Sequence, residues 1–250
     1  MPPNFLRQTA PAKNRATDGA RMSAQPEGLL LVDKPAGVTS HDVVQLVRRA
    51  YGERSIGHLG TLDPFATGLL ILLLGRSTRL ATFIDTEPKV YEATIRFGAE
   101  TDTDDLTGAV IREAAAPSPE AVRQAIPELT GTISQIPPAY SAKSVDGVRA
   151  YDAARRGEAI DLPPAQVQVM EWVIREERDC EMDVTITCGT GTYIRALARD
   201  LGRATGSAAH LSALRRIRSG VFDVRDAATF DDIRESRPSL QRLTIVASHV

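Results

Sequence analysis

A single carboxylate, Asp63, in the glycine-rich stretch GHLGTLDPFATG is the first residue that suggests chemistry. Pro64 follows it directly, and the next segment, LLILLLG, is almost wholly apolar. A carboxylate at the edge of an apolar region can act as a nucleophile or a base, provided that a cation keeps it ionised. Asp-Pro also begins ordinary turns, so the spacing alone leaves a purely structural turn as the alternative.

Two residues distant in the sequence complement that carboxylate. Tyr91 stands on the apolar face of the alternating segment KVYEATIRFG, and Arg195 opens a helical pattern after a glycine turn, beside Tyr193. A neighbouring arginine lowers the pKa of an aspartate by about one to three units. An aromatic ring offers a stacking face for an extruded base. An acid, a phenol and a guanidinium group therefore form a coherent site for a base and a ribose.

Other kinds of site lack the patterns that they need. The four histidines lie far apart and fit neither HExxH nor Cys-His spacing. DTDDLTGAVIRE resembles a calcium loop at its ends, but Leu106 and Thr107 stand where a ligand and a glycine are required, so we expect an acidic surface turn. The sequence contains no nucleotide-binding glycine fingerprint, Walker lysine or Gly-x-Ser-x-Gly motif. We expect no metal site.

The bulk composition is typical of a cytoplasmic globular protein. The 250 residues are 42% hydrophobic and 25% charged, which suits one large domain or a domain with a smaller appendage. A net charge of −2 argues against a uniformly basic surface but not against a local one. No apolar run suits a transmembrane helix or a signal peptide. Cys180 and Cys188 lie in strand-like segments and are expected to pack as small reduced hydrophobic side chains.

Helical periodicity and capping residues mark six segments. Thr39 or Ser40 is expected to cap the first helix and Gly52 to end it, whereas Ser118 and Pro119 begin the third. The six segments are HDVVQLVRRAYG, RSTRLATFID, SPEAVRQAIPELTG, a short stretch that ends at Gly157, YIRALARDLGRATG and DAATFDDIRES.

Strand patterns occupy much of the remaining chain. KVYEATIRFG, AQVQVMEWVI and EMDVTITC alternate in the manner of half-buried strands. LLILLLG is too short for a membrane and predicts a buried strand, while GLLLV, GTISQ and HLSALRRIRSGVFDV supply further strands or bends. Because no regular βαβ repeat is present, we predict an α+β fold with a mixed, largely antiparallel sheet flanked by helices.

The first 26 residues are predicted to be a disordered tail. They are rich in Pro, Ala, Arg, Gln and Asn and show no periodicity. Their basic side chains either touch RNA or belong to an inert tail, and Met22 is an alternative start of the chain.

Six blocks resemble, in order, those of the TruB-type tRNA pseudouridine synthases, which convert the T-loop uridine at tRNA position 55. They are GLLLVDKPAGVTS, GHLGTLDPFATGLL, KVYEATIRFGAETDTDD, IPPAYSAKSVDGVRAY, GTYIRALARDLG and HLSALRRIRSG, and they extend from about Gly28 to Ser219. The resemblance implies a pseudouridine-synthase core over residues 27–222, with a thumb-like RNA-binding insertion at about 133–160. It also implies a reaction without a metal or an external cofactor.

Many members of this family carry a C-terminal PUA module, a small β-barrel that grips the tRNA acceptor stem. Only about thirty residues follow Gly220 here. We therefore expect residues 223–250 to form a short helix and a tail rather than a full PUA domain. The lack of that module would affect acceptor-stem contacts and tRNA affinity, and not the chemistry.

The resemblance also implies roles for single residues. Asp63 matches the catalytic aspartate, Tyr91 the tyrosine that packs on the target base, and Arg195 the arginine paired with the aspartate. Tyr193 and Leu214 match positions that line the uridine pocket. The remaining matches are His58, expected to fill the stack left by displaced nucleotides, Lys143 in the RNA-gripping thumb, and the supporting positions Lys34, Pro35, Gly57, Gly60 and Pro64.

The implied reaction breaks the C1′–N1 bond of uridine, turns the uracil over and rejoins it through C5, so it needs no redox partner. The aspartate attacks C1′, assists formation of a glycal or adds to C6, and the sequence leaves these routes open. The expected partner is the tRNA T arm, bound by a monomer with no membrane partner, and tRNA folding is a possible second activity. Local basic clusters supply candidate phosphate contacts: Arg48 with Arg49, Arg76 with Arg79, Arg155 with Arg156, and Arg215 and Arg216 with Arg218.

Two other functions compete with this interpretation. An RNA-binding protein or folding chaperone without catalysis would be favoured by an altered Asp63, Tyr91 or Arg195, and all three are intact. A phosphotransferase or hydrolase with Asp63 as nucleophile needs a second aspartate two residues on, where this chain has Phe65, and magnesium ligands.

Overall fold

The computed structural model describes residues 25–141, 143–145, 148–149, 156 and 162–241. Nearly all of the predicted N-terminal tail, the short helix before Gly157 and the last nine residues lie outside these ranges. Within them, no helix combines the length and the apolar character needed to cross a membrane.

One mixed sheet of nine strands organises the described chain. Its main order is β1-β3-β12-β4-β11-β10-β7, with β2 paired to β3 and β13 paired to β12. Every pairing is antiparallel except that of β3 with β12. The strands are β1 (Gly28–Lys34), β2 (Ile56–Leu59), β3 (Thr67–Leu74), β4 (Lys89–Phe97), β7 (Gly131–Gln135), β10 (Ala165–Arg178), β11 (Glu181–Cys188), β12 (Ala209–Ser219) and β13 (Phe222–Asp223). The predicted α+β fold with a mixed, largely antiparallel sheet is confirmed.

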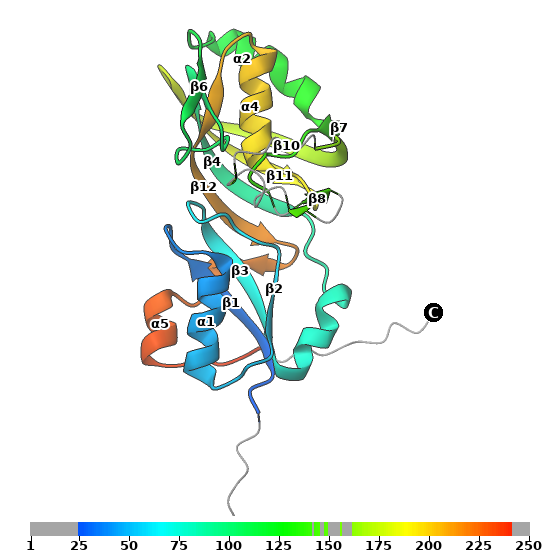
Figure 1. Ribbon diagram of the computed structural model, residues 1–250, viewed down its shortest axis with the longest axis vertical. Coiled ribbons are helices and arrows are strands. Elements are labelled where there is room, and N and C mark those ends of the chain that lie inside the picture. Colours follow the sequence, from blue (N-terminus) through cyan, green and yellow to red (C-terminus); the bar gives the residue numbers. More distant parts are fainter. Residues whose placement is uncertain (1–24, 142, 146–147, 150–155, 157–161, 242–250) are drawn as a thin grey trace, which may run out of the picture.

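The helices gather at two ends of this sheet. Figure 1 shows α1 and α5 together at one end and α2 and α4 together at the other. The helical elements are α1 (Ser40–Tyr51), η1 (Gly75–Phe83), α2 (Pro119–Ala125), η2 (Ile126–Leu129), α4 (Ile194–Ala204), η3 (Val224–Asp226) and α5 (Phe230–Glu235). Two small hairpins complete the fold: β5 (Ala99–Thr101) with β6 (Val110–Glu113), and β8 (Ser144–Val145) with β9 (Val148–Arg149).

Local sequence signals explain where α1 begins and ends. The Thr39 hydroxyl accepts a hydrogen bond from the Asp42 amide, and the Asp42 carboxylate accepts one from the Thr39 amide. Such a cap stabilises a helix by about 1 kcal/mol. The helix ends at Gly52, whose φ of 67° lies in the left-handed region that glycine adopts readily.

The apolar run in β3 is explained by burial on both faces of the strand. Leu70, Leu72 and Leu74 face one hydrophobic core, whereas Leu69 and Ile71 face a second core with β1 and η1. The parallel strand β12 lies so close to β3 that position 68 must be a glycine. A Cβ on Gly68 would lie 2.3 Å from the Arg216 carbonyl oxygen. The strand β3 therefore anchors the loop that precedes it, which contains the candidate catalytic aspartate.

Two local predictions were wrong in detail. RSTRLATFID forms the 3₁₀ helix η1, in which the Thr78 hydroxyl donates to the Gly75 carbonyl three residues back, a geometry that suits the tighter helix. Cys188 is buried in the core as predicted, but Cys180 is exposed because it lies in the turn between β10 and β11 rather than within a strand. Both cysteines are free.

Candidate active site

The structure brings Asp63 and Arg195 into contact from opposite parts of the chain. Asp63 lies in the loop between β2 and β3, and Arg195 lies in the first turn of α4. The Arg195 Nε atom is 2.9 Å from Asp63 Oδ2, and Nη2 donates to Oδ1 at 3.2 Å. The hydrogen bond from Nη2 and the close approach of Nε hold the carboxylate against the guanidinium group. The Arg195 side chain is 4% exposed and that of Asp63 is 35% exposed, so the carboxylate stays accessible from one side.

The guanidinium group of Arg195 is itself held rigidly. Nη1 donates to the Thr103 carbonyl at 2.7 Å, and Nη2 donates to the Tyr140 carbonyl at 2.9 Å. Nη1 also lies 3.5 Å from Oδ2 of Asp105, whose other oxygen accepts hydrogen bonds from the backbone and hydroxyl of Thr107. Arg195 thus bridges two carboxylates, of which only Asp63 has an exposed face.

The prediction that DTDDLTGAVIRE is an acidic surface turn was wrong for two of its carboxylates. Asp104 and Asp105 are 5% and 4% exposed, because each faces an arginine of α4. Asp104 pairs with Arg199 at 2.8 Å, as Asp105 pairs with Arg195. Farther along the helix Arg203 pairs with the buried carboxylate of Glu100. The sequence held a signal for this contact: arginines four residues apart lie on one helix face, which needs an acidic partner when it is buried.

Opposing influences act on the Asp63 carboxyl. Burial raises its pKa above the ordinary value, and the nearby charge of Asp105 adds to this increase. The Arg195 guanidinium works against both by charge and by hydrogen bonding, and Lys34 helps more weakly. Arg195 therefore opposes the increase in the pKa of Asp63 that burial causes, and so favours the ionised carboxylate.

The turn that carries Asp63 is supported by a buried lysine. Lys34 is fully buried, and its Nζ donates to the carbonyls of Pro35, Val38 and Pro64 at 2.9, 2.8 and 3.3 Å. Burial lowers the pKa of Lys34 to about 8, while the charge of Asp63 opposes that decrease. Three carbonyls from two loops thus converge on one ammonium group directly behind the candidate nucleophile.

Tyr91 of β4 lines the same cavity as Asp63, and so does the buried side chain of Arg216. Arg216 on β12 is 1% exposed; its Nε donates to the Leu69 carbonyl at 2.8 Å and its Nη2 to that of Gly60 at 3.0 Å. Its positive charge also acts on the Tyr91 phenol and partly opposes the effect of burial on the pKa of that phenol. Burial raises the pKa of the Tyr91 phenol, so the ring is neutral at physiological pH. The prediction of a basic cluster at the surface was wrong for Arg216, because the central strand β12 points it at main-chain carbonyls.

These side chains surround one cavity of about 690 Å³. A pocket of this size is within the range that holds small organic groups such as a nucleoside. The described residues contain no cluster of three His, Cys, Asp or Glu side chains that could hold a metal ion. The predicted site residues that line the cavity are His58, Gly60, Asp63, Pro64, Tyr91, Tyr193, Arg195 and Leu214.

Comparisons with known proteins identify the family of this chain. Residues 48–194 match the model of the TruB family pseudouridylate synthase N-terminal domain, and residues 195–242 match that of the tRNA pseudouridylate synthase B C-terminal domain. The chain belongs to the TruB family. A relative from Leifsonia xyli subsp. xyli, named tRNA pseudouridine synthase B, is 50% identical over 80% of this chain and 69% of its own length. A relative of the same name from Mycobacterium tuberculosis is 45% identical over 88% of this chain and 75% of its own.

Solved structures share the fold of this TruB-family chain. The match in a crystal structure of a Cbf5-Nop10-Gar1 complex has a TM-score of 0.64 and 28% identity, and it covers 82% of this chain and 53% of that chain. The match in a structure of an H/ACA RNP bound to a substrate RNA containing 2′-deoxyuridine has a TM-score of 0.61 and 26% identity, and covers 82% and 51%. This chain thus spans about half the length of those chains, and it has the pseudouridine-synthase fold.

Four residues predicted for the TruB-type site lie outside the cavity wall. Lys34 and Pro35 are behind it, in the supporting turn, and Gly57 lies in β2, where an added Cβ would meet open space. Gly60 differs from Gly57, since its φ is 73° and a Cβ there would lie 3.3 Å from Arg216. Lys143 precedes β8 and is half-buried.

Sequence reasoning missed Lys89 as a cavity residue. Lys89 begins β4, is 8% exposed and lines the cavity two residues before Tyr91. Its Nζ donates to the Thr190 hydroxyl at 3.2 Å, and burial lowers its pKa. The sequence pattern of β4 did not single out Lys89, because a lysine at the start of a strand is ordinarily exposed to solvent.

Proposed function

We propose that this TruB-family protein isomerises the T-loop uridine at tRNA position 55, with Asp63 as the catalytic carboxylate. Its family membership makes the protein a pseudouridine synthase that acts on tRNA. The specific position and the residue roles are the proposal. The observation that carries the proposal is the ion pair of Asp63 and Arg195 at 2.9 Å. The Asp63 side chain is still 35% exposed and lines the cavity.

Asp63 is the reacting group in this proposal, and Arg195 positions it. The reaction breaks the C1′–N1 bond and forms a C1′–C5 bond; C5 loses its proton, and N1, freed from the ribose, takes up one proton, so that the product is an isomer of the substrate. Attack at C1′, assistance to a glycal and addition at C6 all begin with an ionised carboxylate. Arg195 supplies that state and orients both oxygens without leaving its contacts to Thr103 and Tyr140.

Tyr91, Tyr193 and Leu214 enclose the uracil. All three line the cavity, and Tyr91 lies close enough to the buried Arg216 to feel its charge. A neutral phenol ring can pack on a base without competing for the charge of Asp63. Side chains packed against the base also shield it from water.

Flipping the uridine out of the T loop costs a few kcal/mol. We propose that His58, which lies in β2 and lines the cavity, offsets this cost by stacking in the position that the uridine leaves. Burial lowers the pKa of the His58 imidazole, so the ring is neutral and suited to stacking in the vacated position. Lys143 and the insertion at about 133–160 are assigned to gripping the RNA, although much of that segment lies outside the described residues.

The proposal extends to the rest of the predicted organisation. Residues 27–222 form the catalytic unit, and the protein acts on tRNA as a cytoplasmic monomer. Assistance to tRNA folding is included as a second activity, since flipping the target base already requires the enzyme to open the T loop.

Tritium release tests the proposal directly. An unmodified tRNA transcript labelled at uridine C5 is expected to release one equivalent of tritium, and a transcript with cytidine at position 55 is expected to release none. Asp63→Asn keeps the shape of the side chain but not its charge, so it should bind tRNA within a few-fold of wild type and release nothing. Appreciable turnover by Asp63→Asn would refute Asp63 as the catalytic group. Binding without release by the wild-type protein would favour the chaperone alternative.

A further inference from the structure

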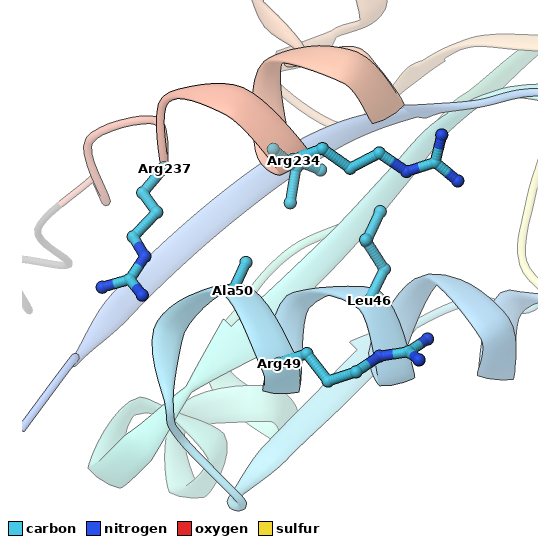
Figure 2. A pocket seen from close by; sticks show the side chains of 6 residues that line it. Leu46, Arg49, Ala50, Arg234 and Arg237 are labelled. Atoms are coloured by element: carbon cyan, nitrogen blue, oxygen red, sulfur yellow. The ribbon is translucent and has the colours of Figure 1, made fainter.

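A second hollow, of about 500 Å³, lies between α1 and α5, and three arginines surround it. Figure 2 shows Leu46 and Ala50 of α1 beneath it, with Arg49 and Arg234 reaching toward one end and Arg237 toward the other. Ile233 completes the apolar wall. We call this hollow the arginine groove, defined by Leu46, Arg49, Ala50, Ile233, Arg234 and Arg237.

The positive charge of the arginine groove is poorly neutralised. Among the described residues, Arg49 and Arg237 have no carboxylate within 4 Å, and Arg49 uses only its Nε, on the Gln45 carbonyl. Arg234 makes one exposed ion pair of 3.6 Å with Asp231, and its guanidinium group lies 5.5 Å from the centroid of the Phe230 ring. Exposed pairs of this kind contribute little. Three guanidinium groups around one hollow repel each other, and in a chain with a net charge of −2 such a concentration calls for an external anion.

The groove is also built rather than accidental. Arg237 has a φ of 48°, a left-handed conformation that is unfavourable for a residue with a Cβ and before a proline. The Tyr51 hydroxyl donates a hydrogen bond to the next carbonyl, that of Pro238, and so ties the end of α1 to the segment after α5. This contact holds the Arg237 backbone in place beside the groove.

We propose that the arginine groove binds phosphates of the tRNA backbone outside the catalytic cavity. The inference rests on tRNA being the substrate. His41 near the start of α1 lines the cavity and Arg49 lines the groove, so eight residues of one helix separate the two sites, about 12 Å at 1.5 Å per residue. Along the axis of a B-form duplex, successive phosphates of one strand advance by about 3.4 Å. An RNA with its uridine in the cavity therefore carries phosphates to the groove within roughly three or four nucleotides.

Guanidinium groups suit this partner because each presents a planar fork to phosphate oxygens. The apolar wall between them carries no base-reading polar group, so the contact is expected to position the RNA without reading its sequence.

Salt dependence of tRNA binding tests the proposal. All proteins carry Asp63→Asn, so that binding is measured without turnover and a failure of the catalytic assignment would not affect the result. The groove variant is Arg49→Gln/Arg234→Gln/Arg237→Gln. The matched control, Arg96→Gln/Arg123→Gln/Arg178→Gln, removes the same charge from exposed arginines of β4, α2 and β10.

The groove variant is expected to bind tRNA about tenfold or more weakly, and its slope of log K against log salt should be smaller by about two to three. The control variant should keep the wild-type slope. The charge-retaining variant Arg49→Lys/Arg234→Lys/Arg237→Lys should keep it as well. Thermal denaturation identifies any variant that does not fold, and single substitutions then replace the triple. Equal affinity and slope in the groove and control variants would overturn the proposal. Self-association that only the groove variant loses, with tRNA binding unchanged, would overturn it in favour of a protein interface.

Discussion

Arg195→Lys offers the sharpest test of the site, because it keeps the charge and removes the planar fork. The guanidinium group makes two contacts to Asp63 and one to each of the Thr103 and Tyr140 carbonyls. A lysine ammonium can reach one or two of these four acceptors, so at least one buried carbonyl loses its partner. Each such loss costs about 1–3 kcal/mol. We therefore expect the variant to be less stable by about 2–4 kcal/mol.

The expected loss of activity is larger than this stability loss implies. In the variant, the lysine ammonium replaces the contacts of Nε and Nη2 with Asp63 by at most one contact, so the carboxylate is free to rotate. Misplacement of a reacting group by about 1 Å costs roughly 100-fold in rate. The burial that raises the pKa of Asp63 is then less well opposed, which lowers the ionised fraction further. We expect single-turnover tritium release to slow by about 100- to 1,000-fold, with tRNA binding within a few-fold of wild type.

Arg199→Lys is the matched control for this experiment. Arg199 lies one turn farther along α4 and is equally buried, with contacts to Asp104 at 2.8 Å and to the Ile136 carbonyl at 2.8 Å, but it does not line the cavity. Its substitution should lower stability by a similar amount and change the single-turnover rate by less than about tenfold. Near-normal rates in Arg195→Lys, or equal rate losses in both variants, would refute the positioning role of Arg195.

Four further predictions follow from the same geometry. Tyr91→Phe removes a buried hydroxyl beside the charge of Arg216, so thermal denaturation should show a loss of about 1 kcal/mol; an unchanged single-turnover rate would limit Tyr91 to packing. Lys34→Met leaves three carbonyls without their donor and should destabilise the protein by about 2–3 kcal/mol and slow tritium release, whereas full activity would show that the turn holds Asp63 without it. The pKa of Asp63 is raised and catalysis needs its ionised form, so the single-turnover rate should fall in acid with an apparent pKa above the ordinary 3.8; a limb below 3.8 would contradict this. EDTA should leave tritium release unchanged, and inhibition restored by a divalent ion would contradict the metal-free chemistry.

Much of the fold is predictable from the sequence because the signals are local. The cap at Thr39 and the stop at Gly52 define α1, and both act within one helical turn. The alternation of β4 and the apolar run of β3 match their burial, one strand buried on one face and the other on both. Asp63, Tyr91 and Arg195 can be singled out for a similar reason, since each has a recognisable local context: a glycine-rich loop, an alternating strand and the start of a helix.

Residues whose burial depends on a distant partner escaped prediction. The acidic turn was expected at the surface, but Asp104 and Asp105 are buried because arginines about 90 residues later in the chain neutralise them. Arg216 looked like one more surface arginine beside Arg215 and Arg218. It is buried because carbonyls of Leu69 and Gly60 point at it from neighbouring segments. Lys89 lines the cavity for a similar reason, since its ammonium group donates to the hydroxyl of Thr190, which lies far along the chain.

By itself the sequence determined the elements, the α+β class, the family and the three residues proposed for catalysis, since each leaves a trace within a short window of residues. Only the tertiary structure decided which charges are buried, which carboxylate stays open to the cavity and which arginines gather in the groove between α1 and α5. Burying a charge is costly unless a partner lies within a few ångströms. Whether such a partner exists is settled by the packing of distant segments, and not by the residues on either side.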